Sequence, residues 1–166
     1  MVTTEHPGFE SGDPQAQRWA RLADDILVIA REIQFRGYRN ADALPLTPSE
    51  GMVMRHMQLE PDTTFASLLA AVGLQRTNLS TVLRGLEQKG LIERRVRPDD
   101  RRAITIHRTP RGRTNFAIVS AEWATAVSSA AGGEVGDLDA ALTLLETIRQ
   151  GLVSTRPPAP SKGVDN

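Results

Sequence analysis

The sequence contains no cysteine. This absence excludes disulfide bonds, thiol nucleophiles, cysteine-based zinc sites and peroxide sensing through thiols. The sequence also has no long apolar run, since none exceeds the five residues of 26–30, whereas a membrane-spanning helix needs roughly 20. The acidic N-terminal region lacks the basic and then apolar segments of a signal peptide. We therefore expect a cytoplasmic protein.

The motifs of common enzyme classes are also absent. The sequence has no phosphate-binding loop, no pair of histidines at metal-ligand spacing and no nucleophile elbow. Its three histidines, His6, His56 and His107, lie far apart in the chain. The sequence therefore predicts neither an enzyme nor a metal or cofactor site.

The length of 166 residues fits one domain with tails, and 40% hydrophobic and 24% charged residues are typical of a globular protein. The charge is unevenly distributed, although the formal net charge is zero. Residues 75–113 contain eleven Arg and Lys against four Asp and Glu, a net charge of +7, so the rest of the chain has −7. A local positive field on an acidic body indicates a polyanionic partner.

Hydrophobic periodicity predicts a mainly α-helical chain. A first long helix starts at Pro14 and stops near Gly37, and Thr47-Pro48-Ser49-Glu50 predicts a capping box for a second helix that runs to about Leu59. A short third helix follows residues 61–64 and ends at Gly73, and a fourth covers residues 76–89 before Gly90. Residues 92–96 and 103–108 alternate as two strands. Thr109-Pro110 begins a fifth helix that runs to about Ala130, and a last helix follows Gly132-Gly133.

Two helices joined by a tight turn and followed by a basic two-stranded ribbon are the order of a winged helix-turn-helix. Short polar side chains on the second of these helices suit the major groove of DNA, and an arginine-rich ribbon suits phosphates or a narrow minor groove. The candidate DNA-binding residues of this helix are Gln75, Arg76, Thr77, Asn78, Ser80, Thr81 and Arg84. Those of the wing are Arg94, Arg95, Arg97, Asp100, Arg101 and Arg102.

The sequence resembles the MarR family over roughly residues 18–153. Four segments carry the resemblance, in order and at the right spacing: Leu46-Thr47-Pro48-Ser49-Glu50, Leu86-Glu87-Gln88-Lys89-Gly90-Leu91-Ile92, Asp99-Asp100-Arg101-Arg102-Ala103 and Ile106-His107-Arg108-Thr109-Pro110-Arg111-Gly112. Each segment is weakly specific by itself. Together they are a strong signal, because independent coincidences would have to multiply.

The resemblance implies a homodimer whose two winged lobes bind double-stranded DNA at a near-palindromic operator. It implies that Asp100 orients Arg102 in the wing, and that Arg101 or Arg97 enters the minor groove. It also implies a cleft for a small aromatic or anionic ligand, for which the candidates are Phe35, Tyr38, Met54, Arg55 and His56. Three positions depart from the family pattern: Gly85 replaces a usual charged residue, Thr81 a common arginine, and Gln75 the usual short capping side chain.

The resulting hypothesis is a winged helix-turn-helix on a helical dimerisation domain, acting as a transcriptional regulator and repressor. We expect an N-terminal arm at residues 1–13, a dimerisation helix at 14–40, the DNA-binding lobe at 41–109, dimerisation helices at 110–154 and a disordered tail at 155–166. The alternative is a winged-helix protein-interaction module that no longer reads an operator. The retained arginines argue against this alternative.

Overall fold

The computed structural model describes residues 13–61, 63–96, 104–133 and 136–157. The chain divides into two compact units, Met1–Gly37 and Tyr38–Asn166. The first unit contains helix α1, Pro14–Phe35, which begins at the proline expected from the sequence. Asp13 precedes it, and its Oδ1 accepts a hydrogen bond from the Gln15 amide at 2.8 Å, which satisfies one of the free N–H groups at the helix start.

The second unit opens with a loop that is bound to a later helix. The side chain of Asn115 bonds both backbone groups of Leu44, accepting from its N–H at 2.7 Å and donating to its carbonyl at 3.1 Å. Helix α2, Pro48–Leu59, then starts with the predicted capping box. The Glu50 amide donates to Thr47 Oγ1 at 3.2 Å, and the Thr47 amide donates to Glu50 Oε2 at 2.8 Å.

The two helices of the helix-turn-helix lie where the sequence predicted them. Helix α3, Phe65–Val72, ends at Gly73, whose φ of +66° is the left-handed conformation that a tight turn needs. Helix α4, Arg76–Gln88, follows after three residues and is succeeded by Gly90 with a φ of +69°. Glycine at both positions avoids the steric cost that a Cβ would have there.

The sheet has three strands, whereas the sequence predicted two. Strand β1, Thr63–Thr64, pairs with β3, Ile104–Arg108, which also pairs with β2, Ile92–Val96. All pairings are antiparallel and the order is β1-β3-β2. The prediction treated Thr63 and Thr64 only as helix-capping residues, because a two-residue strand has no period of its own. Thr64 does cap α3, accepting from the Ser67 amide at 3.1 Å, so it serves both elements.

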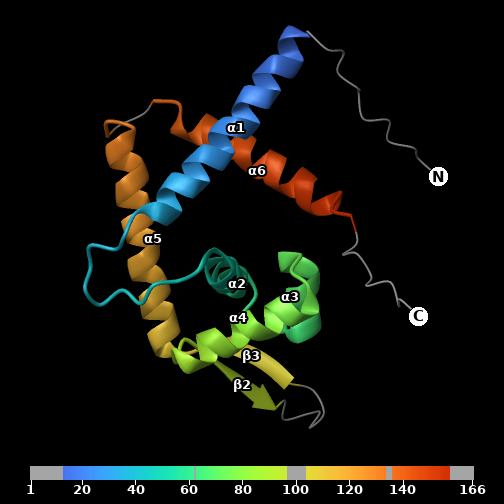
Figure 1. The fold of residues 1–166 in the computed structure, drawn as a ribbon, viewed down its shortest axis with the longest axis vertical. Helices are drawn as coiled ribbons and strands as arrows, with labels where there is room; N and C mark the ends of the chain where they lie inside the picture. The colour runs from blue at the N-terminus through green and yellow to red at the C-terminus, as the bar shows by residue number, and fades with distance from the viewer. Residues whose placement is uncertain (1–12, 62, 97–103, 134–135, 158–166) are drawn as a thin grey trace, which may run out of the picture. The chain divides into compact units, whose positions relative to one another are not determined.

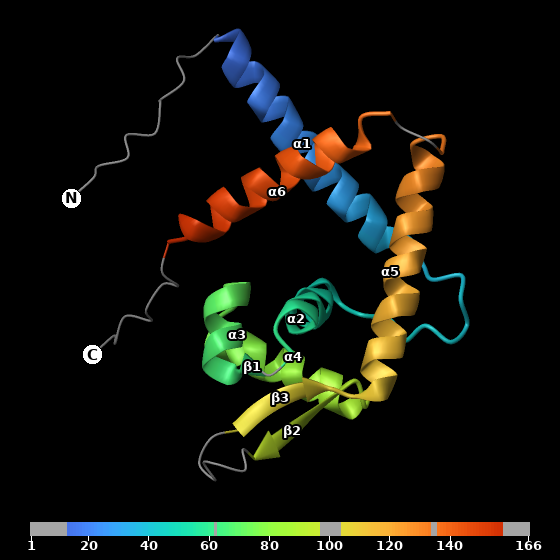
Figure 2. The same ribbon diagram turned by 180° about the vertical axis from the view of Figure 1, so that it is seen from behind.

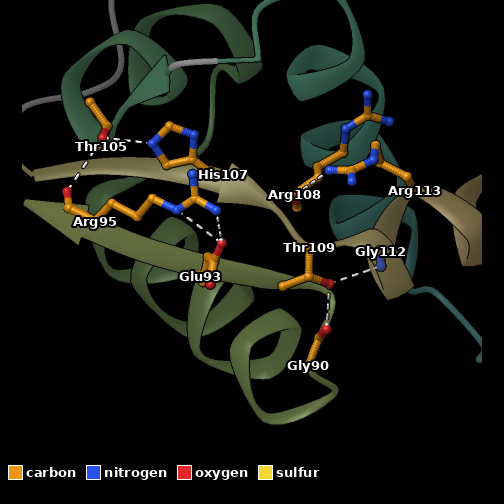
Figure 3. A network of polar contacts seen from close by, with 9 residues as sticks. All are labelled: Gly90, Glu93, Arg95, Thr105, His107, Arg108, Thr109, Gly112 and Arg113. Atoms are coloured by element: carbon orange, nitrogen blue, oxygen red, sulfur yellow. Dashed lines mark hydrogen bonds and ion pairs between the residues drawn. The ribbon is translucent and has the colours of Figure 1, made fainter.

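Helix α5, Pro110–Ala130, and helix α6, Leu138–Ser154, complete the chain. Figure 3 shows how α5 is joined to the end of α4, because Thr109 Oγ1 donates to the Gly90 carbonyl at 2.7 Å and accepts from the Gly112 amide at 2.9 Å. Gly112 packs directly against the backbone of Leu91, since a Cβ at Gly112 would lie 1.9 Å from the Leu91 carbonyl oxygen. The Thr-Pro-x-Gly segment therefore fixes the start of α5 against the base of the wing.

The hydrophobic core lies among α2, α3, α4 and the sheet, with Phe116 from α5. In Figures 1 and 2, α4 lies beside the β2–β3 hairpin, and the hairpin extends away from the helices. The fold is thus mainly α-helical with a small antiparallel wing. None of the helices in the described ranges is both long and apolar enough to cross a membrane.

Candidate nucleic-acid interface

Helix α4 has one buried face and one exposed face. Leu79, Leu83 and Leu86 are completely buried in the core, as their spacing predicted. The candidate DNA-binding residues Gln75, Arg76, Thr77, Asn78, Thr81 and Arg84 are exposed, and Ser80 is half-buried. The apolar face therefore fixes the helix in the protein and leaves the polar face accessible over its first three turns.

The polar side chains of α4 differ in how free they are. The hydroxyls of Ser80 and Thr81 donate to the carbonyls of Arg76 and Thr77, at 2.9 and 3.1 Å, so their oxygens remain as acceptors. The guanidinium of Arg76 lies 5.2 Å from the centre of the Phe65 ring, and this cation–π contact holds the Arg76 side chain against α3. The side chain of Gln75 makes no capping bond, which agrees with its departure from a short capping residue.

An ion pair between a buried carboxylate and a half-buried lysine holds the end of α4 against α2. Glu50 is almost fully buried, and its Oε2 accepts from Lys89 Nζ at 2.7 Å. Lys89 Nζ also donates to the Pro45 carbonyl at 2.8 Å. A Cβ at Gly85 would lie 3.0 Å from Glu50 Oε1, so a glycine lets α4 approach this carboxylate closely. This contact explains why Gly85 departs from the charged residue usual there.

Two glutamates hold the arginines at the base of the wing. Arg94 donates to Glu87 through Nε at 2.8 Å and through Nη2 at 3.2 Å, which joins β2 to the last turn of α4. Arg95 donates to Glu93 through Nε at 2.9 Å and Nη2 at 2.5 Å. The sequence did not predict these pairings. Both arginines nevertheless stay exposed, so their remaining N–H groups face solvent.

Strand β3 carries a second network of polar contacts (Figure 3). His107 Nε2 lies 2.7 Å from Thr105 Oγ1, which donates to the Arg95 carbonyl across the ladder at 3.3 Å. Arg113 Nη1 donates to the Arg108 carbonyl at 3.0 Å. Burial and the nearby Arg113 guanidinium lower the pKa of Arg108, which marks a concentration of positive charge beside the wing.

Four of the predicted wing residues, Arg97, Asp100, Arg101 and Arg102, lie outside the described residues. Of the candidate cleft residues, Met54 is completely buried in the core. Tyr38 and His56 are half-buried, and Arg55 is exposed, with its guanidinium 5.7 Å from the centre of the Trp123 ring. Phe35 belongs to the first unit and is 70% exposed. Within the described ranges, no three His, Cys, Asp or Glu side chains gather as metal ligands.

Comparison with protein families gives a match between residues 46–104 and the model of the MarR family. This segment begins just before α2 and ends at the first residue of β3. The chain is also similar to the HTH-type transcriptional regulator PetP of Rhodobacter capsulatus, with 28% identity over 111 residues. That alignment covers 62% of this chain and 67% of PetP.

Solved structures share the fold. Streptococcus pneumoniae FabT in complex with DNA superposes with a TM-score of 0.60 and 22% identity, covering 86% of this chain and 98% of FabT. BpsR of Bordetella bronchiseptica, whose DNA binding is regulated by 6-hydroxynicotinic acid, gives a TM-score of 0.57 and 16% identity, covering 86% of this chain and 97% of BpsR. At these identities the likeness shows a common architecture.

Proposed function

Since the chain belongs to the MarR family of transcriptional regulators, we propose that it binds double-stranded DNA at a specific sequence through α4 and the wing. One observation carries this proposal: α4 has a continuous exposed polar face beside a positively charged ribbon, while its apolar face is fixed in the core. A helix exposed in this way fits the major groove, where side chains reach base edges.

The side chains of α4 have distinct roles in this proposal. The Asn78 amide can donate to and accept from one adenine edge, and the Arg76 or Arg84 guanidinium can donate twice to a guanine. Ser80 and Thr81 accept from base amino groups, since their own hydrogens bond the helix backbone. Gln75 and Thr77 lie at the helix start, where contacts to phosphates set the register.

The wing binds the DNA backbone in this proposal. Glu87 and Glu93 are the acidic residues of segments 75–96 and 104–113, and each is already bonded to an arginine. The remaining positive charge of these segments attracts phosphates. We assign Arg94 and Arg95 to phosphates. We assign Arg97, Arg101 and Arg102 to the minor groove or to phosphates, with Asp100 orienting Arg102.

We further propose that the protein acts as a homodimer and a repressor. No residue of α1 or α6 is buried within the chain, although both helices are amphipathic. The exposed large apolar residues of α6 are Leu138, Leu142, Leu144, Leu145, Leu152 and Val153. A second copy of the chain would cover them and would place two α4 helices against a near-palindromic operator, where the bound dimer blocks transcription.

We also propose that a small aromatic or anionic ligand releases the DNA. Two observations support it: the fold is shared with BpsR, and Arg55 presents a cation on the Trp123 ring at the surface of the second unit. Tyr38, Arg55 and His56 of the second unit are the proposed contacts. Met54 would contribute only from within the core.

Selection from random duplexes tests the central proposal. Purified full-length protein is mixed with a pool of random double-stranded DNA, and the bound fraction is sequenced after several rounds. We expect a near-palindromic motif with half-sites about one helical turn, roughly 10 base pairs, apart. A bound fraction as random as the input, with binding lost at moderate salt, would contradict the proposal and favour the protein-interaction module instead.

A further inference from the structure

Arg156 follows the last turn of α6, and its side chain contacts α3, far away in the sequence. Its Nη1 donates to the carbonyl of Ala71 at 2.8 Å and approaches the carbonyl of Ala70 at 3.4 Å. These carbonyls belong to the last turn of α3, where the helix itself provides no partner. A guanidinium at this end is also favoured by the negative end of the helix dipole.

The same side chain covers the turn of the helix-turn-helix. A Cβ at Gly73 would lie 2.6 Å from Arg156 Nη1, 2.8 Å from its Cζ and 3.0 Å from its Cδ. The guanidinium and its stem therefore lie directly against the backbone of the residue whose positive φ makes the turn into α4. Gly73 thus has two constraints, its conformation and the closeness of Arg156.

Arg156 is connected to α6 without a flexible spacer. The Thr155 amide donates to the Gly151 carbonyl at 3.1 Å, and Thr155 Oγ1 donates to the same carbonyl at 2.8 Å. The Arg156 amide lies 3.4 Å from the Val153 carbonyl. These bonds continue the helical path, so a displacement of the end of α6 is transmitted to the Arg156 side chain and from there to α3.

We propose that Arg156 is a positioning residue that fixes the helix-turn-helix relative to α6. This proposal rests on the proposed function, in which α6 contributes to the dimer and α4 reads DNA. Because a short turn joins α3 to α4 and both helices pack in the same core, holding the end of α3 also restrains α4. In the dimer, Arg156 therefore sets the separation of the two α4 helices and hence the spacing of half-sites that the protein accepts.

The test uses full-length protein with Arg156→Ala, Arg156→Lys and the control Arg149→Ala. Arg149 is an exposed arginine of α6 that bonds Glu146 of that helix, so its loss removes the same charge without touching α3. Each protein is titrated with duplexes that carry the selected half-sites at the selected spacing, or at a spacing changed by one or two base pairs. Wild type and Arg149→Ala should prefer the selected spacing.

We expect Arg156→Ala to bind the selected spacing about three- to tenfold more weakly, the range for loss of such hydrogen bonds, and the altered spacings with little change. Arg156→Lys should restore part of the preference, because an ammonium group also donates to carbonyls. A uniform loss of affinity at every spacing, or the same profile as Arg149→Ala, would overturn the proposal.

Hydrogen exchange without DNA separates this proposal from the proposed function. Amides of the turn between α3 and α4 should exchange several-fold faster in Arg156→Ala than in wild type or Arg149→Ala. If wild type shows no sequence preference, the proposed function fails, whereas unchanged exchange at the turn contradicts the role of Arg156 itself.

Discussion

Individual charged side chains decide how much of the positive surface is available to DNA. Arg94 uses two of its N–H groups on Glu87, and the two side chains are 46% and 31% exposed. An exposed ion pair of this kind contributes little to stability, typically below about 1 kcal/mol. Its main effect is therefore on the local charge and on the orientation of the guanidinium.

Glu87→Gln should strengthen binding to DNA of any sequence, because the substitution removes a negative charge and frees Arg94 for a phosphate. The slope of log affinity against log salt concentration should become steeper by about one. Binding isotherms with unspecific duplex DNA at several salt concentrations measure this slope.

Glu146→Gln is the matched control for this measurement. Glu146 of α6 bonds Arg149 and Gln150, which lower the pKa of its carboxyl group to about 2, so it is ionised at any assay pH near neutrality. Its substitution should leave the slope for DNA unchanged. Equal slopes for the wild type and Glu87→Gln would contradict the assignment of Arg94 to the DNA-facing surface.

Asn78→Ala should reduce discrimination among DNA sequences rather than affinity as such. Asn78 is exposed on α4, and one bidentate amide contact with adenine accounts for about 1–3 kcal/mol of discrimination. Gln88→Ala, which removes an exposed amide at the other end of α4, is the control. Competition between the selected duplex and single-base variants should show a loss of preference at one position of each half-site for Asn78→Ala alone. An equal loss of affinity for every duplex would instead assign Asn78 to a contact with the DNA backbone.

Not all residues of the interface could be predicted from the sequence. The sequence predicted the exposed face of α4, because leucines at helical spacing identify the buried face. It did not predict that Glu87 and Glu93 bond the wing arginines. The contact of Glu87 with Arg94 depends on the packing of β2 against α4, whereas Glu93 and Arg95 lie two residues apart in β2 and meet through the conformations of their side chains. Gly85 replaces a usual charged residue, and the closeness of Glu50 on the neighbouring helix, which no sequence pattern reveals, accounts for this departure.

Among the secondary-structure elements, α4, the wing and α5 meet at one junction. Thr109 caps α5 and bonds Gly90, which follows the end of α4, and Gly112 touches the backbone of Leu91. One side chain thus connects the helix proposed to read DNA with a helix proposed to contribute to the dimer.

Thr109→Val should lower the free energy of unfolding by about 1–3 kcal/mol, because it removes the helix cap and leaves the Gly90 carbonyl without this donor. Thr125→Val is the control, since its hydroxyl donates to the Ala121 carbonyl on an exposed face of α5 and neither caps the helix nor joins elements. Urea denaturation followed by circular dichroism measures both. If Thr109→Val lowers the free energy of unfolding by no more than Thr125→Val does, the hydrogen bonds at this junction do not stabilise the fold.

The sequence predicted most elements because their ends have local signals. Thr47, Thr109, Gly73 and Gly90 mark helix boundaries within a few residues, and the structure confirms each of them. Strand β1 escaped prediction because it exists only through pairing with β3, some forty residues later in the chain. Arg156 was assigned to a tail starting at residue 155, since its partners are carbonyls of α3 that no sequence pattern reveals.

At the scale of the whole molecule, the exposed apolar residues of α6 predict a dimer. Leu142→Glu combined with Leu145→Glu should give a monomer, because the two charges would be buried in the interface. Leu59→Glu, at a leucine of α2 that is 71% exposed, is the control and should remain dimeric. Light scattering at low micromolar concentration measures the mass of each protein. A wild type that is folded and monomeric at that concentration would contradict the dimer.

The proposed function requires that this chain distinguishes one DNA sequence from another. The most direct test compares binding of the wild type to the selected duplex and to a scrambled duplex of the same length and composition, at several salt concentrations. We expect the affinity for both duplexes to fall as salt rises, while the selected duplex stays bound at least about a thousandfold more tightly. Equal affinities for the two duplexes at every salt concentration would contradict it.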